Sequence, residues 1–390
     1  WFHHLFSISG GHPRTVEAIL ALCRVREHVS LASIVQQVQT SVAEWERGQA
    51  TRWVPLALPS AILSREVRLK DTTADGETTY GQLLSLGTIT NTLGGTAEVP
   101  SRLVPKLNLF TLGAWSNRPQ KAGENKEQEG ESNLQDEHKV SKDATRRLLS
   151  FGHDLDPHRY ELFHAQWERL ARHLWKGPAF LCQSSKTVPA FYQGGVLLAG
   201  RNVQFLPAGK HYREFPGTFS VDILNLLEVG DVFICQGTSN PGFDVGCLCL
   251  DANQRKHLFL IELKFSDVAS TTVLGAPVLI HKVKQVVENY RGFWQTKQDN
   301  SLGLLETDVT FVLAPIRDVT GDIAHKWGSL PRDFKGNVVL LSRQTLLASY
   351  GPSLRDCAGF HLSWNSRLSP PQVPTPMKQK HGQGVFTGSK

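Results

Sequence analysis

Two carboxylates and a lysine lie near the ends of two neighbouring predicted strands. Asp244 stands at the start of one strand, and Glu262 and Lys264 stand at the end of the next. Because side chains alternate between the faces of a strand, Glu262 and Lys264 share a face with Leu258 and Leu260. That face changes from apolar to charged, and removing either charge from water costs several kcal/mol unless it is paired or bound to an ion. The pattern therefore needs a partner or a ligand.

These three side chains are the parts of a site for metal-assisted phosphodiester cleavage. The polar segment between the strands, 251–256, has the length of a hairpin connection, so we expect Asp244 beside Glu262 in an antiparallel pair. Mg²⁺, or Mn²⁺ in its place, prefers oxygen ligands, and both carboxylates with the Leu263 carbonyl predict a metal site. Lys264 would orient the attacking water or neutralise developing charge. The alternative is a structural Glu262–Lys264 ion pair at the rim of a sheet.

The next predicted helix, 281–294, adds polar groups that suit a phosphate. Lys282, Gln285 and Asn289 are spaced to share one helix face, so Lys282 and Gln285 are expected to point back towards the carboxylates. Lys284 adds to a local basic cluster that predicts contact with DNA. A solvated helix face would have the same composition, and this alternative stays open.

This constellation resembles the PD-(D/E)xK restriction-endonuclease-like superfamily. The resemblance lies in Phe243-Asp244, in Glu262-Leu263-Lys264 at the end of an apolar strand, and in a following helix with Gln285 and Tyr290. The departure is Phe243, which stands where the family pattern has proline. The resemblance implies a magnesium-dependent hydrolase in which the two carboxylates bind metal and the lysine and glutamine assist the attack.

The elements that must carry these residues alternate between helix and strand. Hydrophobic periodicity predicts helices at 160–174, 221–228 and 281–294, a helical patch at 322–327, and strands at 231–236, 243–250, 257–265, 308–313 and 337–341. This order predicts an α/β (α+β) fold, and the resemblance implies a restriction-endonuclease-like mixed sheet flanked by helices. Glu161 stands in the first of these helices, where the family often has a glutamate, so the resemblance adds it as a metal ligand.

The chain as a whole is similar to Crinkler-type and retrotransposon-hot-spot-type proteins, which couple a STAND/AAA ATPase to such a nuclease domain. Ser9-Gly10-Gly11-His12-Pro13-Arg14, before a predicted helix at 15–23, is similar to the start of the ATPase lid. Residues 54–115 would then form its winged-helix part. No GxxxxGK[ST] phosphate loop is present, so the resemblance implies an ATPase domain upstream of Trp1. We accordingly expect this chain to be a fragment.

Composition divides the chain into four segments. We expect an ATPase lid and winged-helix-like domain at 1–116, a charged flexible linker at 117–147, a nuclease-like domain at 148–365 and a disordered Pro/Gly tail at 366–390. The linker prediction rests on seven basic and seven acidic residues among few apolar ones. The net charge of +6 says little about the folded domains, because four of the basic residues lie in the tail without an acidic residue.

Composition also excludes some classes of protein. No run approaches the roughly 18–20 apolar residues of a membrane span, so we expect no membrane insertion. Six scattered cysteines predict buried free thiols in a reducing compartment. The predicted function is a metal-dependent DNA nuclease, and the resemblance implies action in the nucleus. The alternative is a catalytically inactive module that binds DNA or a protein with the same fold.

Overall fold

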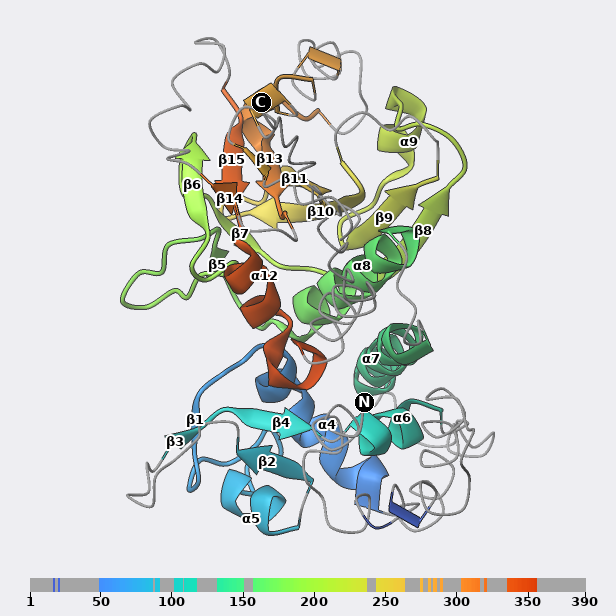
Figure 1. Cartoon of the computed structure of the whole chain (residues 1–390), viewed down its shortest axis with the longest axis vertical. Helices are drawn as coiled ribbons and strands as arrows, with labels where there is room; N and C mark the ends of the chain where they lie inside the picture. The colour runs from blue at the N-terminus through green and yellow to red at the C-terminus, as the bar shows by residue number, and fades with distance from the viewer. Residues whose placement is uncertain are drawn as a thin grey trace, which may run out of the picture.

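The structure is a computed structural model, and it places a large sheet at one end of the molecule and small helices and strands at the other (Figure 1). It describes residues 17, 20–21, 49–86, 88–91, 102–107, 109–117, 132–150, 157–236, 243–263, 274–275, 280–281, 283–285, 288–289, 303–315, 319–320 and 335–355. The predicted helical patch at 322–327 and the predicted tail at 366–390 lie outside these residues.

The part of the chain from 49 to 117 combines short helices with two-residue and three-residue strands. The helices are α4 (Gln49–Ile62), α5 (Tyr80–Ser85) and α6 (Leu109–Asn117). Strand β1 (Val67–Arg68) pairs antiparallel with β3 (Arg102–Leu103), and β2 (Ile89–Asn91) pairs antiparallel with β4 (Pro105–Leu107). Helix α5 begins at a capping box, because Thr79 accepts from the Gln82 amide while Gln82 accepts from the Thr79 amide. The winged-helix assignment stays a prediction.

Helix α7 (Ser132–Ser150) corrects the predicted linker. Residues 132–147 belong to a 19-residue helix that packs between α6 and α8 (Pro157–Leu174). Its buried strip is narrow and partly polar, with Ala144 and Leu148 beside Ser141 and Thr145. Because hydroxyls and one alanine supply much of this strip, hydrophobicity alone does not reveal it. Asp143 on α7 forms an ion pair of 2.6 Å with Arg169 on α8.

A nine-stranded mixed sheet forms the centre of the larger half. Its strands are β5 (Ala179–Phe180), β6 (Val196–Ala199), β7 (Gln204–Leu206), β8 (His211–Phe215), β9 (Asp231–Cys235), β10 (Val245–Asp251), β11 (Lys256–Glu262), β13 (Val309–Leu313) and β15 (Asn337–Leu340). Their order is β5-β7-β10-β11-β13-β15-β6, and β9 joins β10 to β8. Strands β11, β13 and β15 run parallel, whereas β9, β10 and β11 run antiparallel. The predicted mixed α/β class is confirmed.

The connectivity at the centre of the sheet follows the predicted order. Helix α8 comes first and α9 (Val221–Leu226) precedes the antiparallel strands β9, β10 and β11. Residues 280–281, 283–285 and 288–289 are helical, and β13 then returns parallel to β11. Strands β5 to β8 were not predicted, because they are short and alternate weakly. The other small elements are β12 (Leu274–Gly275), parallel to β14 (Val319–Thr320), and a 3₁₀ turn at Glu306–Asp308.

Both faces of β10 and β11 are buried, in two separate cores. Phe259 and Ile261 belong to the core under α8, and Leu258 and Leu260 belong to the core on the opposite face. The predicted alternation along this strand is therefore confirmed. Gly246 is required in β10, because a Cβ there would lie 2.1 Å from the ring of Phe233 on the neighbouring strand.

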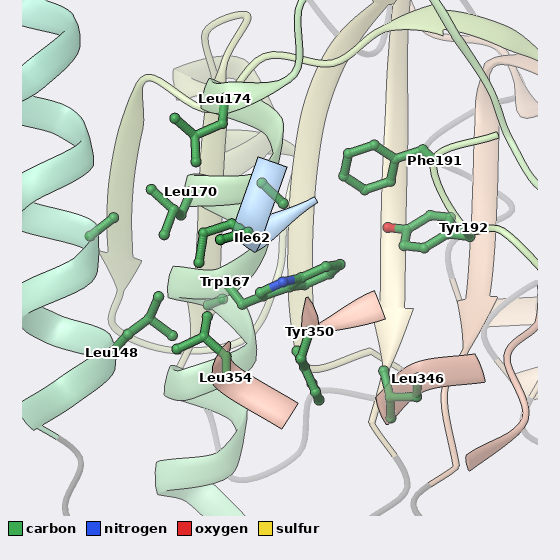
Figure 2. Packing of buried hydrophobic residues seen from close by; sticks show 14 of the residues in the cluster. Ile62, Leu148, Trp167, Leu170, Leu174, Phe191, Tyr192, Leu346, Tyr350 and Leu354 are labelled. Carbon is green, nitrogen blue, oxygen red and sulfur yellow. The ribbon is translucent and has the colours of Figure 1, made fainter. Parts of the chain in front are cut away.

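The C-terminal clasp, residues 343–355, touches both halves of the molecule. It comprises α12 (Arg343–Ser349) and the helical residues 351–355. The Leu107 amide of β4 donates to Ser353 Oγ at 2.8 Å, while Thr345 Oγ1 donates to the Gly194 carbonyl beside the sheet. One core cluster accordingly runs from α4 through α8 to this clasp, so the predicted boundary between 116 and 148 does not separate the cores (Figure 2).

Candidate active site

The structure brings Asp244 and Glu262 together at the adjoining ends of β10 and β11. The register pairs Val245 with Ile261, and each carboxylate residue comes directly outside that pair. Asp244 is half-buried and Glu262 is 7% exposed. The predicted hairpin between them is confirmed, with its turn at residues 252–255.

Asp244 binds the end of β11 through both its backbone and its side chain. Its amide donates to the Ile261 carbonyl at 2.8 Å, and its Oδ2 accepts from the Leu263 amide at 2.6 Å. A short hydrogen bond to an ionised acceptor is stronger than one between neutral groups. The two bonds lie on either side of Glu262 and hold the backbone there.

The preceding residue, Phe243, anchors this strand end in the core. Its ring is buried and meets the rings of Phe219 and Phe233 edge-on, at centroid distances of 5.1 and 6.2 Å. Edge-to-face aromatic pairs add to the stabilisation from burial. The position where the family pattern has proline is thus occupied by a core residue.

Glu262 is also fixed from the other side. Its carbonyl accepts from the Ala314 amide at 2.9 Å, and its parallel neighbour in β13 is Leu313. The side chain shares a sheet face with Leu258 and Leu260, beside which Ile280 and Val283 also pack. The helical residues 280–281 and 283–285 therefore lie on the same sheet face that carries Glu262.

Gln285 and Lys284 lie in that helical segment, and both are partly exposed. Val283, next to them, is buried. Lys264 and Lys282 lie outside the described residues, so their predicted roles stay predictions.

Glu161 lies apart from this pair in the pattern of contacts. It is on α8, whose buried side chains belong to the core on the opposite sheet face. Its Oε2 lies 3.4 Å from Nδ1 of His158, one turn away. Among the described residues, no three His, Cys, Asp or Glu side chains are grouped so as to hold a metal, so Glu161 does not complete such a group with Asp244 and Glu262.

A buried ion pair on α8 was not predicted. Glu168 and Arg172 are both fully buried, and Arg172 Nε donates to Glu168 Oε2 at 2.7 Å. Tyr192 donates to Glu168 Oε1 at 2.8 Å and accepts from Arg172 at 3.0 Å, and Arg172 also donates to Cys249 Sγ at 3.0 Å. The guanidinium carbon lies 4.5 Å from the centroid of the Phe259 ring. The signal in the sequence was the i, i+4 spacing of opposite charges on one helix.

The same network continues to the C-terminal clasp. His164 Nε2 lies 3.5 Å from Glu168 Oε1, and its Nδ1 is hydrogen-bonded to Tyr350 Oη at 2.9 Å. Tyr350 Oη forms a second hydrogen bond, with Tyr160 Oη at 2.6 Å. Trp167 packs edge-on against Tyr350 with centroids 5.2 Å apart (Figure 2). The polar chain thus joins the clasp to α8 and, through Arg172, to β10.

Burial governs the ionisation of this network. Burial favours the neutral form of Glu168, yet the Arg172 guanidinium holds the pKa of that carboxyl below its ordinary value of 4.5. Burial raises the pKa values of Tyr160, Tyr192 and Tyr350, so their hydroxyls stay protonated. Burial also raises the pKa of Cys247 well above its ordinary value, and that of Cys182 to about 11. The four described cysteines are free, as predicted.

Comparison with known proteins found no matching family model, no matching curated protein and no matching solved structure. The family resemblance therefore stays an expectation. Within the described part of the chain, no helix is both long and apolar enough to cross a membrane.

Proposed function

We propose that this protein is a metal-dependent nuclease that cleaves DNA phosphodiester bonds, with Asp244 and Glu262 in its active site. The observation that supports this function best is their position at the adjoining ends of β10 and β11. The connectivity adds support, since three antiparallel strands, a helical segment and a strand parallel to the third follow one another.

The residues present fit a hard divalent cation such as Mg²⁺ or Mn²⁺. Asp244, Glu262 and the Leu263 carbonyl offer oxygen donors only, and Mg²⁺ commonly needs one or two carboxylates because it keeps several waters. When bound, the ion lowers the pKa of a water and stabilises charge on the phosphate. Glu262 is the more buried of the two carboxylates, at 7% exposure.

The other proposed residues act on the attacking water and the DNA. In this proposal Lys264 orients the water, Gln285 positions the reacting phosphate, and Lys282 and Lys284 hold the backbone of the DNA. Partial exposure of Gln285 and Lys284 is compatible with contact to a large ligand. A nuclear location and an upstream ATPase domain belong to the same proposal.

The test is cleavage of supercoiled plasmid by the full 390-residue chain with Mg²⁺, with Mn²⁺ and with EDTA. We expect cleavage with either ion and none with EDTA. Glu262→Gln should lower the rate by more than about 100-fold, the upper end of the losses seen when a group behind a metal ligand is removed.

The matched control is Glu228→Gln, an exposed glutamate whose side chain is 68% accessible. It should cleave at the wild-type rate. Equal cleavage by wild type and Glu262→Gln would contradict the proposal and indicate a contaminating nuclease.

A catalytically inactive binding module is the second candidate. The bond from the Leu263 amide to Asp244 favours it, because this bond gives the carboxylate a structural use. The module would bind a labelled DNA duplex, or a protein partner, without metal-dependent cleavage. Equal DNA binding by wild type and Glu262→Gln, together with plasmid left uncut by wild type in the presence of metal, would support it.

A further inference from the structure

The backbone around Glu262 is held at three consecutive residues by neighbouring strands. The Ile261 carbonyl accepts from the Asp244 amide, the Glu262 carbonyl accepts from the Ala314 amide, and the Leu263 amide donates to Asp244 Oδ2. The first two bonds are backbone bonds that any residue except proline can make. The third depends on the side chain at position 244.

This third bond stands where the regular ladder ends. The pairing of β10 with β11 ends at Val245 and Ile261, so the Leu263 amide lies two residues beyond the last pair. A backbone amide without a partner at such a place is costly when buried, and Leu263 is only 4% exposed. The Asp244 carboxylate therefore adds a hydrogen bond to the chain after β11, beyond the point where the pairing with β10 ends.

Asp244 is itself immobilised by what surrounds it. Phe243 is buried among aromatic rings, and Val245 is fully buried in the opposite core. The two residues that flank Asp244 are thus anchored on opposite sides of the sheet. This leaves the Asp244 backbone little freedom, and its side chain is a fixed acceptor.

We propose that Asp244 is a positioning residue for Glu262. Its carboxylate accepts a hydrogen bond from the Leu263 amide. This bond fixes the backbone at the end of β11 and so the direction in which the Glu262 side chain points. This role rests on the proposed nuclease function and is separate from any part that Asp244 takes in binding metal.

The experiment compares Asp244→Asn with Asp244→Ala in the full chain. Asparagine keeps an oxygen acceptor for the Leu263 amide and removes the charge, whereas alanine removes both. Amide hydrogen exchange at Leu263 reports the bond directly. The Gly230 amide, bonded to the Leu248 carbonyl at 2.8 Å, serves as the control for general loosening of the sheet.

We expect exchange at Leu263 to rise at least about tenfold in Asp244→Ala relative to wild type and to stay within about threefold in Asp244→Asn, with Gly230 changed little in either. Because both variants remove the Asp244 charge from the proposed metal site, both should cleave plasmid more slowly than wild type. Asp244→Asn should retain more activity than Asp244→Ala, because it keeps an acceptor for the Leu263 amide.

Two results would overturn the positioning role. One is equal Leu263 exchange in the two variants. The other is a protected Leu263 amide in Asp244→Asn combined with a cleavage loss as large as in Asp244→Ala, because charge and ligation would then account for the whole effect. If wild type itself shows no metal-dependent cleavage, the proposed function fails, and the positioning role for a catalytic Glu262 fails with it. The expected exchange pattern would then identify Asp244 only as a structural anchor of β11.

Discussion

Glu168 and Glu262 are two of the buried carboxylates in the described residues, and their surroundings differ. Glu168 is compensated by Arg172, Tyr192 and His164, which together occupy both of its oxygens. Glu262 lies at the end of a strand on a face lined by leucines. Burial of a charge is costly, and at Glu168 the compensating guanidinium of Arg172 is itself fully buried.

The Glu168 pair gives a prediction about stability. Glu168→Gln should destabilise the fold by about 3–5 kcal/mol, because it leaves the buried Arg172 charge unpaired. Urea unfolding followed by tryptophan fluorescence measures this change. The control is Glu161→Gln on the same helix, which is partly exposed and should change stability by less than about 0.5 kcal/mol.

The same pair predicts how that difference depends on pH. The pKa of Glu168 is lower in the folded protein than its ordinary value of 4.5, so the charged form stabilises the fold above that value. As the pH falls through the folded pKa, this contribution is lost, and wild type should approach Glu168→Gln. Equal stability of the two proteins at pH 7 would contradict the assignment.

At the scale of elements, the C-terminal clasp depends on one glycine. Gly351 has φ +69°, and a Cβ there would lie 2.5 Å from the Ala61 carbonyl oxygen at the end of α4. The clasp can therefore meet α4 backbone to backbone only without a side chain at this position. Tyr350 directly before it enters the aromatic cluster on α8.

Gly351→Ala should destabilise the protein by about 1–3 kcal/mol, from the left-handed backbone conformation and the collision together. Gly76→Ala is the matched control, because its φ is +73° and nothing lies within 4 Å of the added Cβ. Thermal unfolding of both variants separates the two causes. A loss for Gly351→Ala no larger than for Gly76→Ala would show that the contact with α4 is unimportant.

Across the whole molecule, the sequence predicted the centre of the sheet better than its edges. Strands β9, β10, β11, β13 and β15 contain long apolar runs, and the polar turn between β10 and β11 predicted that Asp244 and Glu262 would be neighbours. Strands β5 to β8 are short, and β6 pairs with β15, far along the chain. The charged composition of residues 117–147 predicts a linker, whereas helix α7 begins at Ser132. Composition does not reveal this helix, because its buried strip is small and partly polar.

The sequence likewise predicted only the part of the site that depends on residues close together in the chain. A hairpin is local, so two carboxylates 18 positions apart could be placed together from their spacing. The buried network was not predictable in the same way, because Tyr350 is separated from His164 by 186 positions. The sequence shows only that Glu168 and Arg172 are spaced to meet on one helix face, and that spacing is also common on exposed helices.

The most direct test of the central claim is Mn²⁺ binding to the full chain, measured by electron paramagnetic resonance of the free ion. Wild type should bind at least one Mn²⁺ that Glu262→Gln loses, with an affinity at least about tenfold weaker in the variant, and Glu228→Gln should bind as wild type does. Identical binding isotherms for wild type and Glu262→Gln would contradict the proposed metal site.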